Sequence, residues 1–472
     1  MPKTIEKLVL KKDTSIRVDG AFHFPIDLNV GRYLQDIEEE LTFKAKGGER
    51  LGFGVGETVN LCKINDGVVT VPRKYAYENF YKSILEQTTE RFADDTRIEI
   101  NFNEERQASR PEMKRKQDAL ISEFLLKFMA QPTPFRGGIY SAPCGTGKTL
   151  CALKIISTLK RPAIVFVHKE FLMEQWRARI LEFTDVKEDE IGHIQSDTCD
   201  YEGKKITLAM LQSVTQRRYP DAVYNAFPVA CFDECHVVSA PLFNTAIPMF
   251  NTRYNLGVTA TDYRRDGLQP VFEWYIGKTL AKMDSSEVVP KIYQISYNEM
   301  VPERLYKWGS KTLLGRLITL LAKDPRRNVM IVNEIIRAVG AGRKIMLLSD
   351  RIEHLKTLKT LLQSSNITAT VSFYIGGMKK VDRKMSEQAD IILGTTAMAK
   401  EGLDIVELDT IFLVSPHGDV QQSIGRILRE HPGKKEPIVV DLVDMGVPLC
   451  VSFAYKRLKQ YRDLGYQIAK SI

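Results

Sequence analysis

A lysine and a threonine, Lys148 and Thr149, follow a run of small residues, and together they suit the binding of a phosphate chain. The run lies between an apolar segment and a helix-forming segment, and it reads Ala142-Pro143-Cys144-Gly145-Thr146-Gly147. The glycines let successive N–H groups point at phosphate oxygens, and the helix start adds partial positive charge. Lys148 can then reach the β- and γ-phosphates, while the Thr149 hydroxyl can bind Mg²⁺. The stretch predicts an ATP site, with Ala142 in place of the usual first glycine.

Two acidic side chains form a second group suited to this chemistry. Asp233 and Glu234 directly follow an apolar run, and Cys235 and His236 come next. The carboxyl end of a strand is where a parallel sheet presents functional groups. We expect Asp233 to hold Mg²⁺ through water and Glu234 to take the proton from the water that attacks the γ-phosphate. We expect His236 to sense the nucleotide and couple it to the second half of the chain.

Two arginines three residues apart, Arg426 and Arg429, predict a basic helix face. Arginine in such a place stabilises charge on a transferring phosphoryl group, and an ordinary solvated helix turn is the alternative. The loop from Gly394 to Asp404 follows another predicted strand. Within it, Gly402 and Asp404 are further candidates for the nucleotide site.

Composition excludes several classes of protein. The 472 residues are 44% hydrophobic and 27% charged, which is typical of a soluble globular chain with more than one domain. No run of 18 apolar residues occurs, so we expect no membrane span and a cytoplasmic protein, in a host cytoplasm if the source is viral. The seven scattered cysteines contain no CxxC pair, and this argues against zinc and disulfides. The net charge of +8 fits either an ordinary surface or a groove for a phosphate backbone.

The elements that position these residues follow a clear order. In residues 1–105, Asp66-Gly67 separates two β-prone runs, which predicts a hairpin in a small α+β domain. A charged stretch from Asn101 to Arg110 reads as a linker. Short β-rich and helical runs then alternate twice, which predicts two consecutive parallel-sheet units. We place them at 106–289 and 290–454, followed by a basic amphipathic helix at 455–472.

Five of these stretches, in order along the chain, resemble the motifs of the superfamily 2 helicases. The resemblance covers residues from about 110 to 445. The sequences of Gln422 to Arg429 and of Arg264-Arg265-Asp266 are most similar to those of the XPB and UvsW group. It implies two RecA-like domains that enclose ATP and Mg²⁺ between them. It also implies that Thr259, Thr261 and Gln422 couple the two domains. Gln117 would read the adenine, although an ordinary helix glutamine is the alternative.

The resemblance further implies a nucleic-acid strand that crosses the strand ends of both units. The candidate contacts are Lys169, Gln212, Ser213, Arg351 and Thr396, and each is equally well explained as a helix cap or a surface residue. Trp274, Tyr275 and Trp308 can stack on bases, but buried packing is the better interpretation. We therefore predict a monomeric ATP-dependent DNA helicase that unwinds or branch-migrates forks and junctions, with residues 1–105 as a DNA-recognition domain. The alternatives are an RNA helicase or RNA-dependent ATPase, and a non-unwinding ATPase that clamps DNA.

Overall fold

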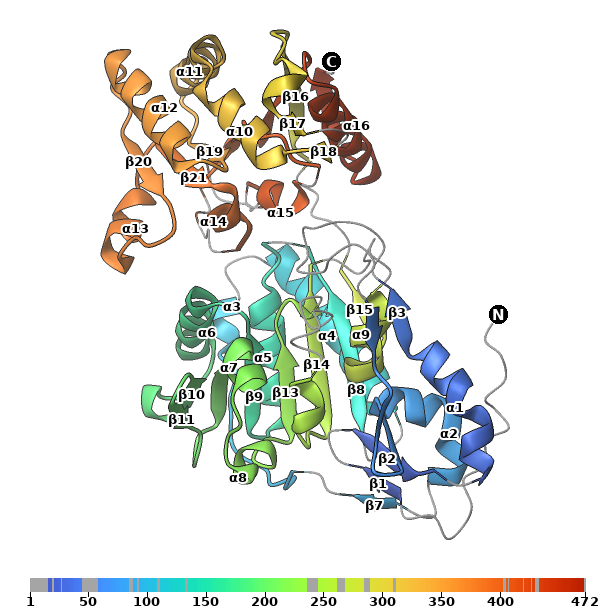
Figure 1. The fold of residues 1–472 in the computed structure, drawn as a ribbon. Coiled ribbons are helices and arrows are strands. Elements are labelled where there is room, and N and C mark those ends of the chain that lie inside the picture. The colour runs from blue at the N-terminus through green and yellow to red at the C-terminus, as the bar shows by residue number, and fades with distance from the viewer. Residues whose placement is uncertain are drawn as a thin grey trace. The chain divides into compact units, whose positions relative to one another are not determined.

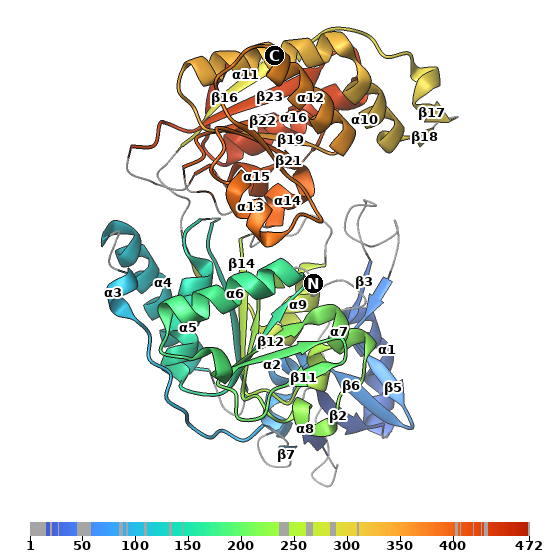
Figure 2. The same ribbon diagram turned by 90° about the vertical axis from the view of Figure 1, so that its left-hand side faces the viewer.

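The computed structural model divides the chain into two compact units, residues 1–284 and 285–472, each shown as a ribbon in Figures 1 and 2. The structure describes residues 16–18, 21–26, 28–44, 58–84, 88–90, 93–107, 111–131, 135–143, 145–235, 245–260, 268–283, 289–308, 311–401, 405, 407–418, 420–425, 427–428 and 433–470. Among the helices in these ranges, none is both long enough and apolar enough to cross a membrane.

The N-terminal domain, residues 16–90, is built on a five-stranded sheet. Only the outer pair β1–β7 is parallel, and the order is β5 (Lys63–Asn65), β6 (Val68–Val71), β2 (Phe22–Pro25), β1 (Ile16–Val18) and β7 (Thr88–Glu90). Asp66 and Gly67 have φ angles of +49° and +74° and join β5 to β6, so the predicted hairpin is confirmed. The domain also contains α1 (Leu28–Glu40), α2 (Arg73–Ile84) and a pair of short strands, β3 (Thr42–Lys44) and β4 (Thr58–Asn60).

The N-terminal domain shares a hydrophobic core with one face of the sheet that follows it. Phe22 and Phe24 belong to the same buried cluster as Phe166 and Val271 of the later residues. The ring of Tyr75 on α2 meets Trp274 on α9 (Gln269–Ile276) edge to face at 5.2 Å, and Figure 1 shows these two helices side by side. Because this interface is apolar, the domain is fixed to its neighbour rather than tethered.

The first lobe, residues 93–283, carries an eight-stranded sheet in which only β10–β11 is antiparallel. The order is β11 (Thr198–Asp200), β10 (Ile191–Gln195), β12 (Ile206–Met210), β9 (Ala163–Val167), β13 (Val229–Phe232), β14 (Tyr254–Thr259), β8 (Arg136–Ser141) and β15 (Thr279–Lys282). The main helices are α4 (Pro111–Met129), α5 (Lys148–Leu159), α6 (Glu170–Phe183), α7 (Leu211–Gln216) and α8 (Asp221–Tyr224), and Figure 2 shows α5 and α6 in front of the sheet.

The stretch from Asn101 onward is not a free linker, so that prediction is wrong for its described part. Within it, the N–H of Asn103 donates to the carbonyl of Phe183 at 2.8 Å. Asn101 donates from its backbone and its side chain to the carboxylate of Asp185, at 2.8 and 2.7 Å. The short helix α3 (Glu104–Gln107) follows. The polar composition that suggested a linker instead supplies these hydrogen bonds.

The second lobe, residues 289–470, contains a seven-stranded sheet that is parallel throughout. Its order is β20 (Val371–Tyr374), β21 (Ile391–Thr395), β19 (Ile345–Ser349), β22 (Thr410–Leu413), β23 (Ile438–Asp444), β16 (Lys291–Tyr297) and β24 (Gln467–Lys470). The helices are α10 (Leu314–Lys323), α11 (Pro325–Gly340), α12 (Ile352–Ser364), α13 (Lys380–Ser386), α14 (Thr396–Glu401), α15 (Gln421–Ile424) and α16 (Pro448–Asp463), and a small ribbon pairs β17 (Lys307–Trp308) with β18 (Lys311–Thr312). Two RecA-like parallel-sheet lobes after a small N-terminal domain confirm the predicted fold class.

The C-terminal helix differs from its prediction at both ends. The helix α16 begins at Pro448, where a proline in the first turn loses no hydrogen bond, and it ends at Asp463. Gly465 then turns the chain with φ of +71°, and residues 467–470 form β24 on the edge of the sheet. Basic residues along this stretch suggested one continuous helix, whereas backbone pairing with β16 decides its last part.

Candidate active site

The phosphate-binding loop leaves the sheet at the end of β8, beside the end of β14. The N–H of Ala142 donates to the carbonyl of Thr259 at 3.0 Å, which holds the start of the loop against the neighbouring strand. Gly145 and Gly147 both have φ of +84°, a conformation that side-chain-bearing residues rarely adopt. Gly147 immediately precedes α5, whose first residue is Lys148. This backbone has the form that lets N–H groups surround an anion at a helix start.

The two acids lie two strands away from this loop on the same edge of the sheet. β13 and β8 flank β14, so Asp233, which follows β13, and the loop before Lys148, which follows β8, lie at the same end of the sheet. The Nζ atom of Lys148 lies 3.9 Å from Oε1 of Glu234. Glu234 has φ of +47°, an uncommon backbone conformation for this residue type and one that collects at functional sites.

The carboxylate of Asp233 is held by two donors. The indole N–H of Trp176 on α6 donates to Oδ2 at 2.9 Å, and the N–H of Glu234 donates to Oδ1 at 3.1 Å. Burial raises the pKa of Asp233 to about 6, and the negative charge of Glu234 adds to the increase. A nearby cation stabilises the charged form of a buried carboxylate beside a second acid, so Asp233 is a candidate ligand for a divalent cation. The sequence did not point to Trp176, because a tryptophan on a helix usually indicates core packing.

Gln117 on α4 contacts the phosphate-binding loop directly. Its Nε2 donates to the carbonyl of Thr146 at 2.8 Å, and its Oε1 accepts from Nε2 of Gln107 at 3.0 Å. A Cβ atom at Gly147 would lie only 2.5 Å from Nε2 of Gln117, so this glycine allows the close approach. The Thr146 hydroxyl donates to the carbonyl of Pro143 at 2.7 Å and closes the loop. Residue 117 therefore lies against the predicted phosphate-binding loop, and Gln107 is a neighbour that the sequence did not reveal.

Comparison with known proteins identifies the family. Residues 110–264 match the family model described as "Type III restriction enzyme, res subunit". A candidate ATP-dependent RNA helicase of Acanthamoeba polyphaga mimivirus, L396, is 32% identical over 358 residues, which are 74% of this chain and 68% of that protein. This chain is a superfamily 2 helicase of the XPB/UvsW-like type. The family implies an ATP-hydrolysing enzyme.

The chain is also similar in sequence to a DNA translocase and in fold to a solved structure bound to RNA. The DNA 3'-5' translocase XPB2 of Sulfurisphaera tokodaii is 24% identical over 351 residues, covering 66% of this chain and 78% of that protein. A solved structure of Mss116p bound to single-stranded RNA and AMP-PNP matches with a TM-score of 0.50 and 13% identity, over 72% of this chain and 71% of that one. The latter shows a shared fold alone.

In the second lobe of the helicase, several polar side chains meet at the carboxyl ends of β19 and β22. The imidazole Nε2 of His417 lies 2.8 Å from Oδ1 of Asp350, and the N–H of Asp350 donates to the Ser415 hydroxyl at 3.0 Å. Burial is the largest single influence on the pKa of Asp350 and would raise it, but the hydrogen bond and the charge of His417, together with smaller contributions from Thr396 and Arg351, lower this pKa below its usual value. Neither His417 nor Ser415 was a sequence candidate, because both follow a strand without a distinctive spacing.

The predicted nucleic-acid contacts also make hydrogen bonds within the lobes. Arg351 donates from Nε to the Thr319 hydroxyl at 3.0 Å and from a terminal nitrogen to the carbonyl of Gly315 at 2.7 Å. Gln212 donates to the carbonyl of His168 at 2.7 Å, and the Ser213 hydroxyl accepts from the N–H of Ser196 at 3.0 Å. These contacts show that the side chains brace the loops at the strand ends.

The remaining candidates have varied environments. Burial lowers the pKa of Lys169, which precedes α6, and Thr396 is buried at the start of α14. Thr259 is buried at the end of β14. Tyr275 is buried and Trp274 packs on Tyr75, in agreement with the packing interpretation. Outside the described residues lie Cys144, His236, Thr261, Arg264, Arg265, Asp266, Gly402, Asp404, Arg426 and Arg429, together with the side chains of Gln422 and Trp308.

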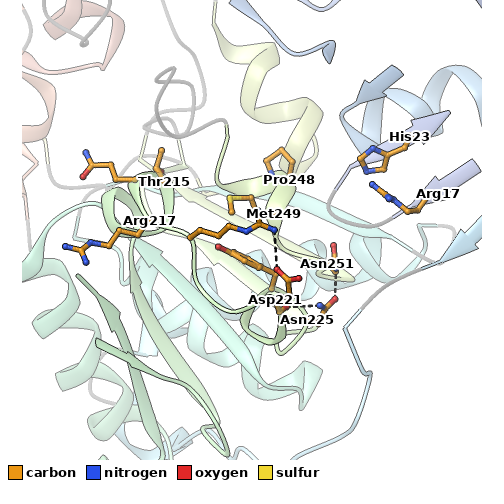
Figure 3. Close-up of a pocket in the computed structure, with 12 residues that line it drawn as sticks. Arg17, His23, Thr215, Arg217, Asp221, Asn225, Pro248, Met249 and Asn251 are labelled. Carbon is orange, nitrogen blue, oxygen red and sulfur yellow. Dashed lines mark hydrogen bonds and ion pairs between the residues drawn. The ribbon is translucent and has the colours of Figure 1, made fainter. Parts of the chain in front are cut away.

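A cavity of about 770 Å³ lies between the N-terminal domain and the first lobe, and Figure 3 shows its lining. Arg17 and His23 come from strands β1 and β2, while Arg217 and Arg218 follow α7 on the other side. Asp221 is the acidic side chain of the described lining, and its Oδ1 lies 3.5 Å from Arg218. The lining therefore carries an excess of positive charge.

Proposed function

We propose that this helicase uses ATP to move along DNA and to unwind or branch-migrate forked and junction duplexes. The observation that carries the proposal is the juxtaposition of Lys148, Asp233 and Glu234 beside a loop shaped for phosphate. These are the groups that hydrolysis of a nucleoside triphosphate requires. The translocase XPB2, named for DNA, supports DNA as the polymer.

Each residue of the site has a role in this proposal. Lys148 binds the β- and γ-phosphates, and the backbone N–H groups from Gly145 to Gly147 surround them. Glu234 accepts the proton of the attacking water, and Gln117 reads the edge of the adenine base. Thr149 and Asp233 would hold Mg²⁺, which supplies positive charge to the phosphate oxygens when bound. Arg426 and Arg429 would stabilise the charge that develops on the transferred phosphoryl group.

The N-terminal domain contributes to DNA recognition in this proposal. The cavity that it forms with the first lobe presents Arg17, Arg217 and Arg218, and arginine is well suited to phosphate contacts. Thr215 and Gln216 of the cavity lining lie on α7, the helix that also carries the candidate strand contacts Gln212 and Ser213. A duplex arm of a fork would place its backbone here. The proposal extends to a monomer that acts in repair, recombination or replication in the cytoplasm, and the viral source of L396 is compatible with a host cytoplasm.

An RNA helicase is the second candidate, and the name of the mimivirus relative favours it. One panel separates the possibilities: ATP hydrolysis and strand displacement with single strands, forks and four-way junctions made of DNA or of RNA. We expect DNA to stimulate hydrolysis more than RNA and forked DNA to be unwound. Greater stimulation by RNA would favour the second candidate, and DNA stimulation without displacement would indicate a clamping ATPase.

The panel needs one inactive variant and one matched control. Lys148→Ala should abolish ATP turnover and retain most nucleic-acid binding, because Lys148 faces the phosphates rather than the polymer. Lys356→Ala removes an exposed lysine that pairs with Glu353 on α12, and it should change neither ATP turnover nor nucleic-acid binding. Full hydrolysis by Lys148→Ala would overturn the assignment of the site.

A further inference from the structure

Three hydrogen bonds run in one direction from α5 back to the phosphate-binding loop. The Nζ of Lys154 donates to Oε1 of Gln107 at 3.2 Å. Nε2 of Gln107 donates to Oε1 of Gln117 at 3.0 Å, and Nε2 of Gln117 donates to the carbonyl of Thr146 at 2.8 Å. Both glutamines are buried, at 5% and 6% exposure, so water cannot readily replace these partners.

The two ends of this chain fix the orientation of both amides. An ammonium group can only donate, and a backbone carbonyl can only accept. Burial alone would lower the pKa of Lys154, but hydrogen bonds with the carboxylates of Asp118 and Glu104 outweigh it and raise the pKa, so Lys154 stays charged. Nε2 of Gln107 also lies 3.4 Å from Oδ1 of Asp118, which is a second acceptor on the same side. Reversing either amide would place two donors or two acceptors face to face.

We propose that Gln107 and Lys154 are positioning residues that make the nucleotide site select adenine over guanine by fixing the amide of Gln117. The inference rests on the proposed role of Gln117 in reading the base. Oε1 and Nε2 of Gln117 each make one of these contacts, so the amide still has one N–H and one oxygen lone pair with which to bind the base. The edge of adenine offers an amino donor beside the N7 acceptor, whereas guanine offers two acceptors, O6 and N7. A fixed amide complements the first edge and opposes O6 of the second.

A free glutamine amide can rotate by half a turn at little cost and so can exchange its donor and acceptor ends. Guanine still offers two acceptors, but a mobile amide can shift away from O6 and donate to one of them. Loosening the amide therefore weakens binding of ATP and lowers the penalty against GTP. The change appears in the ratio of kcat/KM for ATP to kcat/KM for GTP. A purely structural role, in which the four residues only pack three helices together, would lower stability without changing this ratio.

The test uses two variants at residue 107. Gln107→Glu preserves the size and the acceptor for Lys154 but turns an oxygen toward Oε1 of Gln117, so we expect the ATP-to-GTP ratio to fall about tenfold. Gln107→Met preserves the size without a donor, and we expect a smaller fall. In both variants KM for ATP should rise more than kcat falls, because Gln107 lies behind the residue that meets the base.

The matched control is Gln131→Met. Gln131 also makes two amide hydrogen bonds in the first lobe. Its Nε2 donates to the carbonyl of Gly137 at 2.9 Å, and its Oε1 accepts from the N–H of Gly137 at 3.1 Å. It lies outside the chain described above, so its loss should lower stability while leaving the purine ratio unchanged. If Gln107→Glu does not fold, Lys154→Met carries the same test, since it removes the charged end and leaves both glutamines in place.

Two results distinguish this inference from the proposed function. An unchanged purine ratio in Gln117→Ala would show that Gln117 does not read the base, which contradicts its proposed role. A ratio that collapses in Gln117→Ala but stays at the wild-type value in Gln107→Glu, Gln107→Met and Lys154→Met would overturn the positioning role alone.

Discussion

The indole N–H of Trp176 donates a 2.9 Å hydrogen bond to Oδ2 of Asp233, although the two residues are 57 positions apart. Trp176 is 1% exposed, so its ring is fixed by packing and can hold the carboxylate in one orientation. The other carboxylate oxygen accepts from the N–H of Glu234. The acid proposed to hold Mg²⁺ is therefore oriented by an aromatic side chain on a neighbouring helix.

Trp176→Phe should weaken Mg²⁺-dependent hydrolysis. The variant removes one charge-assisted hydrogen bond, worth about 1.5 kcal/mol or roughly a tenfold effect, and retains most of the packing. ATP hydrolysis measured against Mg²⁺ concentration should show a higher half-saturating concentration. Trp274→Phe, at the contact with Tyr75, is the control and should leave this concentration unchanged. A wild-type Mg²⁺ profile in Trp176→Phe would contradict the orienting role.

Arg426→Ala should bind ATP but hydrolyse it slowly. The proposed role of this arginine is to stabilise charge that develops during phosphoryl transfer, so its loss should affect kcat far more than nucleotide binding. A loss of about a thousandfold in kcat is the scale for such residues. Binding of a fluorescent ATP analogue and steady-state hydrolysis measure the two effects separately. Hydrolysis at the wild-type rate would remove Arg426 from the site.

His354 should make the second lobe less stable in mild acid. Its Nδ1 lies 2.9 Å from the Ser349 hydroxyl and its Nε2 lies 2.9 Å from Oδ1 of Asn328. Burial lowers the pKa of His354 to about 3, and the positive charge of Arg327 adds to the decrease. The unfolded chain takes up a proton below its own pKa of about 6.5 while the folded chain does not, so stability is fully present above that pH and is lost as the pH falls toward 3.

Because of His354, the free energy of unfolding at pH 5 should be about 2 kcal/mol lower than at neutral pH. Hydrogen exchange in peptides from β19 and α12, measured between pH 7.5 and 5 and corrected for the intrinsic rate, would show the loss. His354→Leu should be less stable at neutral pH, because Ser349 and Asn328 lose a partner, but it should show a flatter pH dependence. An equally steep dependence in that variant would assign the effect to other groups.

The buried pair of Arg327 and Asp444 should be strongly coupled. Nε of Arg327 lies 2.6 Å from Oδ1 of Asp444, both side chains are 1% exposed, and a terminal nitrogen also donates to the carbonyl of Val414 at 2.6 Å. Asp444→Leu leaves a buried charge without its partner and should lower the free energy of unfolding by about 3–5 kcal/mol. The double variant Arg327→Met with Asp444→Leu should recover much of this loss. Thermal unfolding of the second lobe measures the stability of each single variant and of the double variant. A loss in the double variant equal to the sum of the losses in Arg327→Met and Asp444→Leu would contradict the coupling.

The amino-acid sequence is enough to predict the parts of this helicase that depend on local chemistry. Gly145, Gly147 and Lys148 predict a phosphate-binding loop because the required backbone conformation and charge reside in adjacent residues. Asp66-Gly67 predicts its hairpin for the same reason, and alternating apolar runs predict parallel sheets. The structure confirms the hairpin and the sheets, and it gives the loop its left-handed glycines.

Which distant residues support that chemistry depends on the three-dimensional packing of the lobes. Trp176 reaches Asp233, and Gln107 reaches Gln117, because helices pack on the sheet at particular positions that hydrophobic periodicity does not encode. The polar stretch that begins at Asn101 and the chain end at 467–470 likewise take their structure from partners far along the chain. Local patterns fix which face of an element is buried, whereas the partner that covers it is chosen by the packing of the whole lobe.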